Sequence, residues 1–248
     1  MGHDLTVRFR KARRDPELTV IEGFHALKHA LRFDAELVEA VAVDPDSLDE
    51  LAAELAPDLA GQLSGRVEKI GAEDLAELAP LVPRTGVVAI ARRPAVDLAM
   101  VLADPRPAPV VLLEQPKNMG NIGACIRVAA AAGAAAVLAT GENDPWYPDA
   151  VRGAAGLHFA LPVTSIEVLP PSDRPLLAID PEGEELRPGL LPARAVLAFG
   201  TERHGISGEL LERADARIAI PMREGVSSLN LATSVAIALF SWRLGADI

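Results

Sequence analysis

Five short apolar segments alternate with helical patterns between residues 110 and 222. The segments read VVLLEQ, AAAVLAT, PLLAID, AVLAFG and RIAIPM. A strand whose core lacks alternating polar positions is buried on both faces, which is typical of a parallel sheet covered by helices on both sides. The pattern therefore predicts an α/β domain with a parallel sheet. In such sheets ligands bind at the carboxyl ends of the strands.

Residues 20–97 contain a second, smaller α/β pattern. EGFHALKHALR has helical spacing, LVEAVAV and TGVVAIARR are rich in β-formers, and SLDELAAEL is helical with Ser47 as the expected N-cap. Four prolines then interrupt the pattern: Pro94, Pro105, Pro107 and Pro109. We therefore expect an N-terminal domain over residues 1–97, a linker over 98–108 and a second domain over 109–248.

Composition excludes several classes of protein. The longest nearly apolar stretch, 128–139, is too short to span a bilayer, and the N-terminus is charged where a secretory signal is apolar, so we expect a cytoplasmic protein. The single cysteine, Cys125, forbids an internal disulfide and fits a small packing residue better than a nucleophile. The five histidines have no zinc-site spacing, and we expect no metal.

The charge is unevenly distributed. The formal net charge is −11, whereas contacts to nucleic-acid phosphates require a basic surface. Residues 1–14 nevertheless carry five basic side chains against one acid, Asp4. The basic residues are Arg8, Arg10, Lys11, Arg13 and Arg14. Two interpretations stay open for this arm: a solvated, frayed terminus or an arm that binds phosphates.

Three loops that follow apolar segments combine glycine with an ionic or amide side chain. They are NMGNIGACIR with Arg127, FGTERHGIS with Glu202 and IPMREGVSSLN with Asn230, and all three are expected at one edge of the sheet. The first lacks the third glycine of a dinucleotide fingerprint. Taken singly, Arg127 could be an ion-paired helix residue, Glu202 a carboxylate at a helix N-terminus, and Ser228 an N-cap.

Together and in this order, the three loops resemble the motifs of the SpoU (TrmH-like) branch of the SPOUT superfamily. These proteins are RNA 2'-O-ribose methyltransferases that use S-adenosyl-L-methionine. NMGNIGACIRVAAAAG resembles motif 1, FGTERHGIS motif 2 and IPMREGVSSLNLATSVAIAL motif 3. Residues 9–31 resemble the start of the family's small L30e-like RNA-binding domain. In VRGAAGLHFALPV, Ala154 or Ala155 stands where the family often has serine.

The resemblance implies a fold and an assembly. The C-terminal α/β domain is expected to contain a trefoil knot and to form a homodimer. Val235, Leu239 and Trp242 of the last helix would lie either in that interface or in the core.

The resemblance also assigns residues to the site. The catalytic set is Arg127, Asn121, Glu202, Ser228 and Asn230, and the cofactor-binding set is Thr140, Gly200, Ile220, Met222 and Leu229. The RNA-binding set is the five basic residues of the arm.

The resemblance implies a role for each loop. Because a guanidinium keeps its proton, we expect Arg127 to hold an RNA phosphate and stabilise the developing alkoxide, with the proton acceptor left open. Glu202 would orient polar groups, and Asn230 with Ser228 would fix the last loop and the ribose. Gly225 would give that loop a permissive backbone, and Ser227 or Ser228 would cap the next helix.

Two other functions remain as alternatives: a non-catalytic RNA-binding or ribosome-assembly protein, and a nicotinamide-dependent oxidoreductase. The RNA substrate could be ribosomal or transfer RNA, with a slight preference for ribosomal RNA.

Overall fold

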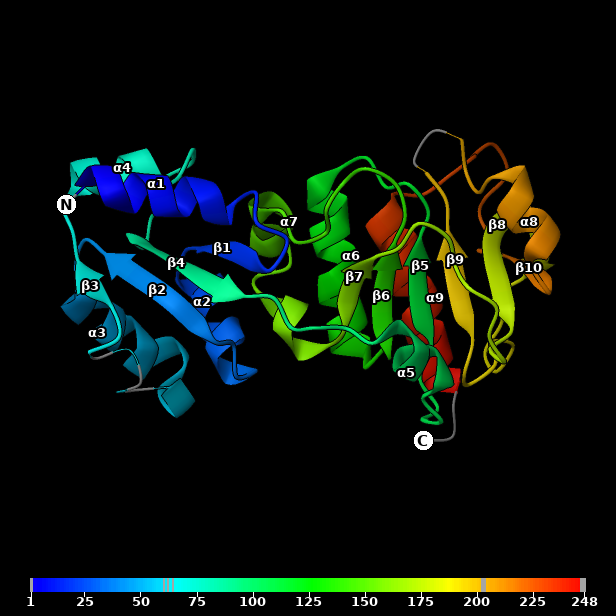
Figure 1. Cartoon of the computed structure of the whole chain (residues 1–248). Coiled ribbons are helices and arrows are strands. Elements are labelled where there is room, and N and C mark those ends of the chain that lie inside the picture. Colours follow the sequence, from blue (N-terminus) through cyan, green and yellow to red (C-terminus); the bar gives the residue numbers. More distant parts are fainter. Residues whose placement is uncertain (1, 60, 62, 64, 202–203, 246–248) are drawn as a thin grey trace. The chain divides into compact units, whose positions relative to one another are not determined.

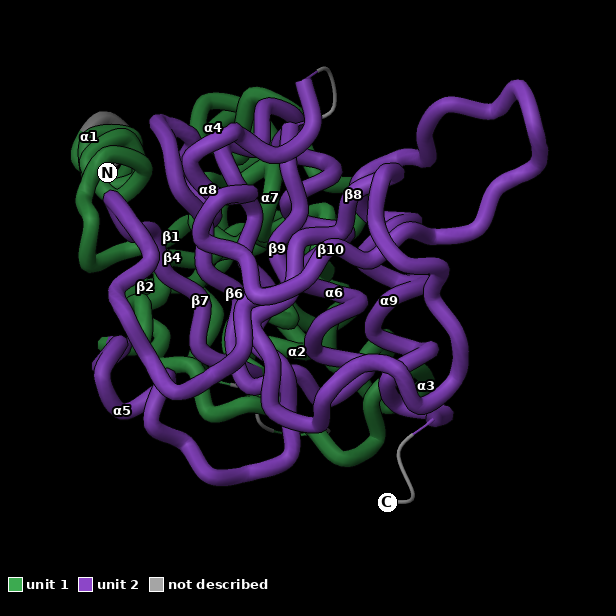
Figure 2. Tube along the Cα trace, turned by 90° about the vertical axis from the view of Figure 1, so that its right-hand side faces the viewer, with its two compact units in different colours: residues 1–95, 146–160 green, residues 96–145, 161–248 purple. Residues whose placement is uncertain are grey.

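The chain divides into two compact units in the computed structural model, which describes residues 2–59, 61, 63, 65–201 and 204–245. Unit 1 comprises Met1–Ala95 and Trp146–Ala160, and unit 2 comprises Val96–Pro145 and Leu161–Ile248 (Figure 2). The division differs from the expected one because residues 146–160, expected in the C-terminal domain, lie in unit 1.

Unit 1 is built on a four-stranded sheet with the order β1-β4-β2-β3 (Figure 1). β4 runs antiparallel to both its neighbours, and β2 runs parallel to β3. The strands are β1 (Leu18–Glu22), β2 (Leu37–Ala42), β3 (Glu68–Lys69) and β4 (Val87–Arg92). The helices are α1 (Gly2–Ala12), α2 (Phe24–Arg32), α3 (Pro45–Leu55), α4 (Ala72–Leu78) and α7 (Pro148–Gly153), with short 3-10 helices η1 (Pro57–Leu59) and η2 (Leu157–Ala160).

The expected helices and strands of residues 20–97 are present, with one correction at α3. Asp44, not Ser47, is the N-cap of this helix, and its carboxylate accepts a hydrogen bond of 3.4 Å from the Ser47 backbone amide. The Ser47 hydroxyl also donates to Asp44, at 2.7 Å. Aspartate and serine are both good N-caps, so the sequence alone did not distinguish them.

The basic N-terminal segment is a packed helix, not a frayed arm. Leu5, Phe9 and Ala12 of α1 are buried in the core of unit 1 with strand residues such as Val20 and Val41. These three side chains recur at helical spacing, so one face of α1 is apolar although its overall composition is basic. Of the five basic residues of the segment, three lie on α1 and two follow it, and Arg8 and Arg13 make ion pairs.

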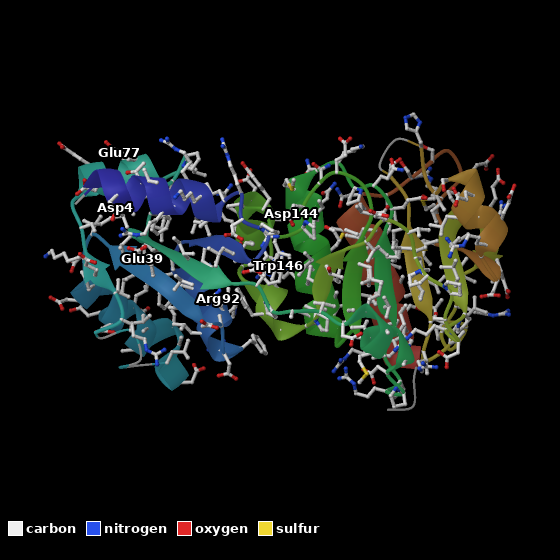
Figure 3. All side chains as sticks on the ribbon, in the orientation of Figure 1. Asp4, Glu39, Glu77, Arg92, Asp144 and Trp146 are labelled. Atoms are coloured by element: carbon white, nitrogen blue, oxygen red, sulfur yellow. The ribbon has the colours of Figure 1, made fainter. Side chains whose placement is uncertain are left out.

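Arg8 donates to Asp4 on the same helix and to both carboxylate oxygens of Glu39 on β2, at 2.9 and 2.7 Å; both acids are labelled in Figure 3. The hydrogen bond to Glu39 raises the pKa of Arg8. Arg13 donates to Glu22 and to the Leu78 carbonyl, each at 2.7 Å. Arg10, Lys11 and Arg14, on α1 and the turn after it, are exposed, as is the ion-paired Arg8.

Residues 146–160 are fixed to unit 1 by buried polar contacts. The Glu22 side chain is only 2% exposed and pairs with Arg13 and, at 2.6 Å, with Arg152. The Thr19 hydroxyl donates to the Trp146 carbonyl at 2.9 Å. A Cβ at Gly156 would lie 2.1 Å from the Ala26 carbonyl oxygen, so only glycine permits this close packing on α2.

Unit 2 contains a six-stranded sheet with the order β10-β8-β9-β5-β6-β7, and every neighbouring pair is parallel. The strands are β5 (Val110–Leu113), β6 (Ala136–Ala139), β7 (Val163–Ser165), β8 (Leu176–Glu185), β9 (Val196–Phe199) and β10 (Ala216–Ala219). Every residue of β5, β6 and β9 is buried. The predicted parallel sheet is therefore confirmed, although β7 was not anticipated.

The helices of unit 2 are α5 (Leu98–Ala103), α6 (Met119–Ala132), α8 (Gly208–Arg213) and α9 (Leu231–Gly245). α6 and α9 pack against each other beside the sheet (Figure 1). Val235, Leu239 and Trp242 are buried within this unit, so they serve its core and not an exposed interface. No helix among the described residues is long and apolar enough to cross a membrane.

The proline-rich segment 98–108 is an ordered part of unit 2 and not an open linker. It contains α5, and the buried guanidinium of Arg174 donates to the carbonyls of Val101, Leu102, Asp104 and Ala108 at 2.8 to 3.3 Å. Burial lowers the pKa of Arg174. One charged side chain thus satisfies four backbone acceptors.

Candidate functional site

A cavity of about 360 Å³ opens at the carboxyl ends of three neighbouring strands, β8, β9 and β10. This is the edge of a parallel sheet at which ligands bind. The lining residues are Ile179, Asp180, Pro181, Phe199, Gly200, Thr201, Gly205, Ile220, Met222, Ser227, Ser228, Leu229, Leu231 and Ser234.

In the loop after β9, two residues that line the cavity are hydrogen-bonded to each other. Thr201 and Gly205 exchange backbone hydrogen bonds of 2.9 and 3.1 Å. A Cβ at Gly200 would lie 2.0 Å from the Gly205 carbonyl carbon, so no larger residue fits there without moving the backbone. Gly200, which is predicted to bind the cofactor, is therefore also required to be glycine by the close approach of Gly205. Glu202, which is predicted to belong to the catalytic set and to orient polar groups, lies outside the described residues.

The loop after β10 supplies the opposite wall. It runs irregularly from Pro221 to Asn230, with a turn in which Val226 donates to the Arg223 carbonyl at 3.1 Å. Gly225 has φ +85°, a left-handed conformation that favours glycine, but a Cβ there would meet nothing within 4 Å. The backbone conformation of Gly225, and not contact with neighbouring atoms, is therefore what restricts substitution there.

Asn230 joins this loop to the first turn of α6. Its side-chain amide donates to the Asn121 side-chain oxygen at 3.0 Å. Its own oxygen accepts from the backbone amides of Ala232 and Thr233 at 2.9 and 3.4 Å, so Asn230 is the N-cap of α9. The expectation that Ser227 or Ser228 caps this helix is wrong. Both serines instead line the cavity.

Arg127 lies on α6, less than two turns after Asn121. The helix begins at Asn118, whose side chain accepts from the Asn121 amide at 3.0 Å, and it ends at Gly133 in a left-handed conformation. The side chain of Arg127 is exposed and makes no ion pair with another described residue. The described residues therefore give no support to the alternative of an ion-paired surface arginine.

Four of the five predicted cofactor-binding residues line this first cavity: Gly200, Ile220, Met222 and Leu229. The fifth, Thr140, lies elsewhere. Its hydroxyl accepts from the Gln115 amide at 3.1 Å, and it lines a second cavity beside β5, β6 and β7.

Sequence reasoning missed Ile179, Asp180 and Pro181, which line the first cavity where β8 leaves its pairing with β9. PLLAID was recognised as a strand, but only the strand order shows that it neighbours β9 and β10.

Known proteins are similar to this chain in sequence and in fold. The model of the SpoU rRNA Methylase family matches residues 108–240. An uncharacterised tRNA/rRNA methyltransferase of Mycobacterium bovis is 34% identical over 206 residues, which are 77% of this chain and 70% of that protein. The 23S rRNA (adenosine(1067)-2'-O)-methyltransferase of Streptomyces azureus is 30% identical over 246 residues, which are 93% of this chain and 87% of that one.

A solved structure has the same fold. The SpoU methyltransferase AviRb from Streptomyces viridochromogenes, in complex with the cofactor AdoMet, superposes with a TM-score of 0.75 at 24% identity, over 94% of this chain and 96% of that one. The range matched by the family model contains all three loops of the cavity edge, from Asn121 to Asn230. The chain belongs to the SpoU rRNA methylase family, as the three motifs predicted.

Proposed function

We propose that the protein transfers the methyl group of S-adenosyl-L-methionine to a ribose 2'-hydroxyl of RNA. The observation that carries the proposal is the hydrogen bond between Asn121 and Asn230. It connects the helix that presents Arg127 to the loop that lines the cavity, so an RNA-binding cation and a small-molecule site share one edge of unit 2.

The residues of the first cavity fit this cofactor. Its volume lies within the range of ordinary small-molecule sites, and it combines apolar side chains with a few polar groups. Ile220, Met222 and Leu229 offer apolar contacts to an adenine ring, and Gly200 brings backbone groups close. The Asp180 carboxylate lies in the same cavity and suits a ligand with cationic groups. When bound, the cofactor supplies an electrophilic methyl group on a sulfonium.

The chain's own residues would align the ribose and stabilise its developing charge. In-line displacement requires the hydroxyl oxygen to be held opposite the sulfur, which is the contribution of positioning. Arg127 holds an RNA phosphate and stabilises the alkoxide through its permanent positive charge. Asn121, Ser228 and Asn230 fix the loop and the ribose. Glu202 orients the polar groups around them.

The RNA substrate is ribosomal RNA in this proposal, with transfer RNA as the other candidate. The family description and the Streptomyces azureus relative both refer to ribosomal RNA. Unit 1 would hold the RNA backbone through Arg10, Lys11 and Arg14, which are exposed along α1 and the turn after it. Arg8 and Arg13 contribute less because carboxylates already neutralise them. The reaction takes place in the cytoplasm.

Unit 2 is proposed to contain the family's trefoil knot and to dimerise. Ile237, Phe240 and Leu244 of α9 are exposed by 36, 40 and 84% of their area. Their spacing places them on one side of the helix, so they form an apolar strip suited to a second copy of the chain. This strip replaces the buried Val235, Leu239 and Trp242 as the proposed dimer contact.

The test is methyl transfer with mapped products. Total RNA from cells lacking the gene is incubated with the protein and S-adenosyl-L-methionine labelled in the methyl group, and 2'-O-methyl positions are mapped with and without protein. The proposal expects label at one or a few riboses of ribosomal RNA. RNA binding without label would favour the non-catalytic alternative. Calorimetric binding of NAD but not of S-adenosyl-L-methionine would favour the oxidoreductase.

A further inference from the structure

The second cavity of unit 2, of about 450 Å³, has no role in the site described so far. It lies at the carboxyl ends of β5, β6 and β7 and is bounded on one side by α8. The lining residues are Leu112, Glu114, Gln115, Thr140, Gly141, Glu167, Val168, Leu169, Ser207, Glu209, Leu210 and Arg213.

This cavity begins one strand away from the proposed cofactor cavity. β5 and β9 are neighbours in the sheet, and the Glu114 amide donates to the Phe199 carbonyl at 2.8 Å. Adjacent strands are about 4.8 Å apart. The segment after β9 borders both cavities, because Gly200 and Thr201 line the first and Ser207 lines the second. If the ribose is held beside a cofactor in the first cavity, its base would therefore lie within reach of the second cavity.

The walls of the second cavity suit a flat ring with hydrogen-bond donors. Leu112, Leu169 and Leu210 are buried apolar side chains on which a ring can pack. The cavity also has three carboxylates, Glu114, Glu167 and Glu209, which are acceptors only when ionised. Such a rim disfavours a phosphate and favours a ligand that presents N–H groups.

One carboxylate is held in a defined position. Glu114 accepts from the Ser207 amide at 2.7 Å and from the Ser207 hydroxyl at 2.5 Å. The same hydroxyl caps α8 by accepting from the Leu210 amide at 3.2 Å. Arg213, at the end of α8, donates to the Leu169 carbonyl at 2.6 Å and so joins α8 to the opposite wall. Glu167 and Glu209 are exposed and remain the acceptors that an entering ligand can reach.

We propose that the second cavity binds the base of the nucleotide whose ribose is methylated and selects guanine over uracil. Unstacked bases are commonly read on their Watson–Crick edge in protein pockets. Guanine presents two adjacent donors there, N1–H and the exocyclic amino group, which match a carboxylate. Uracil presents one donor between two carbonyl oxygens, which carboxylates repel. This inference rests on the proposed function.

The test uses guanosine and uridine 5'-monophosphates, whose phosphates are the same. Methyl NMR follows the side chains of Val168, Leu169 and Leu210 in the full chain during each titration. We expect these resonances to shift with the guanine nucleotide at a dissociation constant at least fivefold lower than with the uracil nucleotide. The double variant Glu167→Gln, Glu209→Gln should lose most of that preference. Glu212→Gln, an exposed site on α8 outside the cavity, should keep it.

A second measurement on the same samples separates the two proposals. Calorimetry with S-adenosyl-L-methionine reports on the first cavity alone. If the cofactor binds but neither nucleotide shifts the three methyl groups, or both shift them equally, base recognition by the second cavity is overturned while the proposed function stands. If the cofactor does not bind, the proposed function fails independently of the nucleotide result.

Discussion

The two sheets of this molecule differ in the direction of their strands, and this difference determines where a ligand site can form. In unit 1, β4 runs antiparallel to β1 and β2, so consecutive strand ends fall on opposite edges. In unit 2 all six strands are parallel, and all their carboxyl ends meet at one edge. The two cavities described above lie at that edge, whereas a cavity of unit 1, of about 250 Å³, lies between α1 and α4.

Arginines pair with carboxylates in both units, and in unit 2 arginine also has two other uses. In unit 1, Arg8, Arg13 and Arg152 pair with carboxylates of the same unit, and Arg13 pairs with the buried Glu22. In unit 2, Arg174 is buried as a structural donor, but Arg127 is exposed at the site. An arginine in unit 2 can therefore be essential to stability or to chemistry, and the two roles are separable by substitution.

The largest expected effect comes from Arg174→Leu. This change removes a buried donor from four carbonyls of residues 101–108, of which those of Leu102 and Asp104 also accept from Arg194, and should cost about 3 kcal/mol of the free energy of unfolding. Denaturant unfolding measures this. Arg187→Leu is the control because Arg187 is exposed and pairs only with Glu184 among the described residues, so its loss should cost at most about 1 kcal/mol. Equal stabilities of the two variants would show that segment 98–108 is not anchored by Arg174.

Arg127→Ala should reduce kcat/KM for methyl transfer at least 100-fold, a loss of about 2.7 kcal/mol of transition-state stabilisation. The affinity for S-adenosyl-L-methionine should stay within about threefold, because Arg127 does not line the first cavity. Initial rates with methyl-labelled cofactor, together with calorimetry, separate the two effects. Arg187→Ala serves as the matched control. Full activity of Arg127→Ala would remove the arginine from the mechanism.

The smallest effect concerns unit 1. Replacing Arg10, Lys11 and Arg14 by glutamine should flatten the slope of log affinity for RNA against log salt by up to about 0.7 for each phosphate that the protein no longer neutralises. These side chains are exposed on α1 and the turn after it, so the fold should be unchanged. Arg8→Gln should alter the slope less, because Glu39 already pairs with Arg8. An unchanged slope in the triple variant would exclude α1 from the RNA interface.

The sequence predicted those features that depend on local pattern. The fully apolar strands of unit 2 and the three glycine-containing loops were located because burial on both faces and close backbone approach restrict residue types locally. Helix α1 was missed because Leu5, Phe9 and Ala12 are spaced among five basic residues, whose charge suggested a solvated arm. Its apolar face becomes recognisable only when the i, i+4, i+7 spacing is examined.

Features that depend on distant contacts could not be predicted. Residues 146–160 return to unit 1 through Glu22 and Thr19, which lie more than 120 residues earlier in the chain. Asp180 lines the first cavity and Thr140 lines the second, and both placements depend on the order of the strands in the sheet. Asn230 was predicted as a site residue, but its double role as cap of α9 and partner of Asn121 requires the folded geometry.

The most direct test of the account is calorimetric titration of Gly200→Ala with S-adenosyl-L-methionine. A Cβ at Gly200 would collide with the Gly205 backbone, whereas a Cβ at Gly208, at the start of α8, would meet nothing within 4 Å. We predict at least a tenfold loss of affinity, or about 1.4 kcal/mol, in Gly200→Ala and wild-type affinity in Gly208→Ala, with thermal melts confirming that both are folded. Wild-type affinity in folded Gly200→Ala would contradict the claim that the cofactor binds at the carboxyl ends of the parallel strands of unit 2.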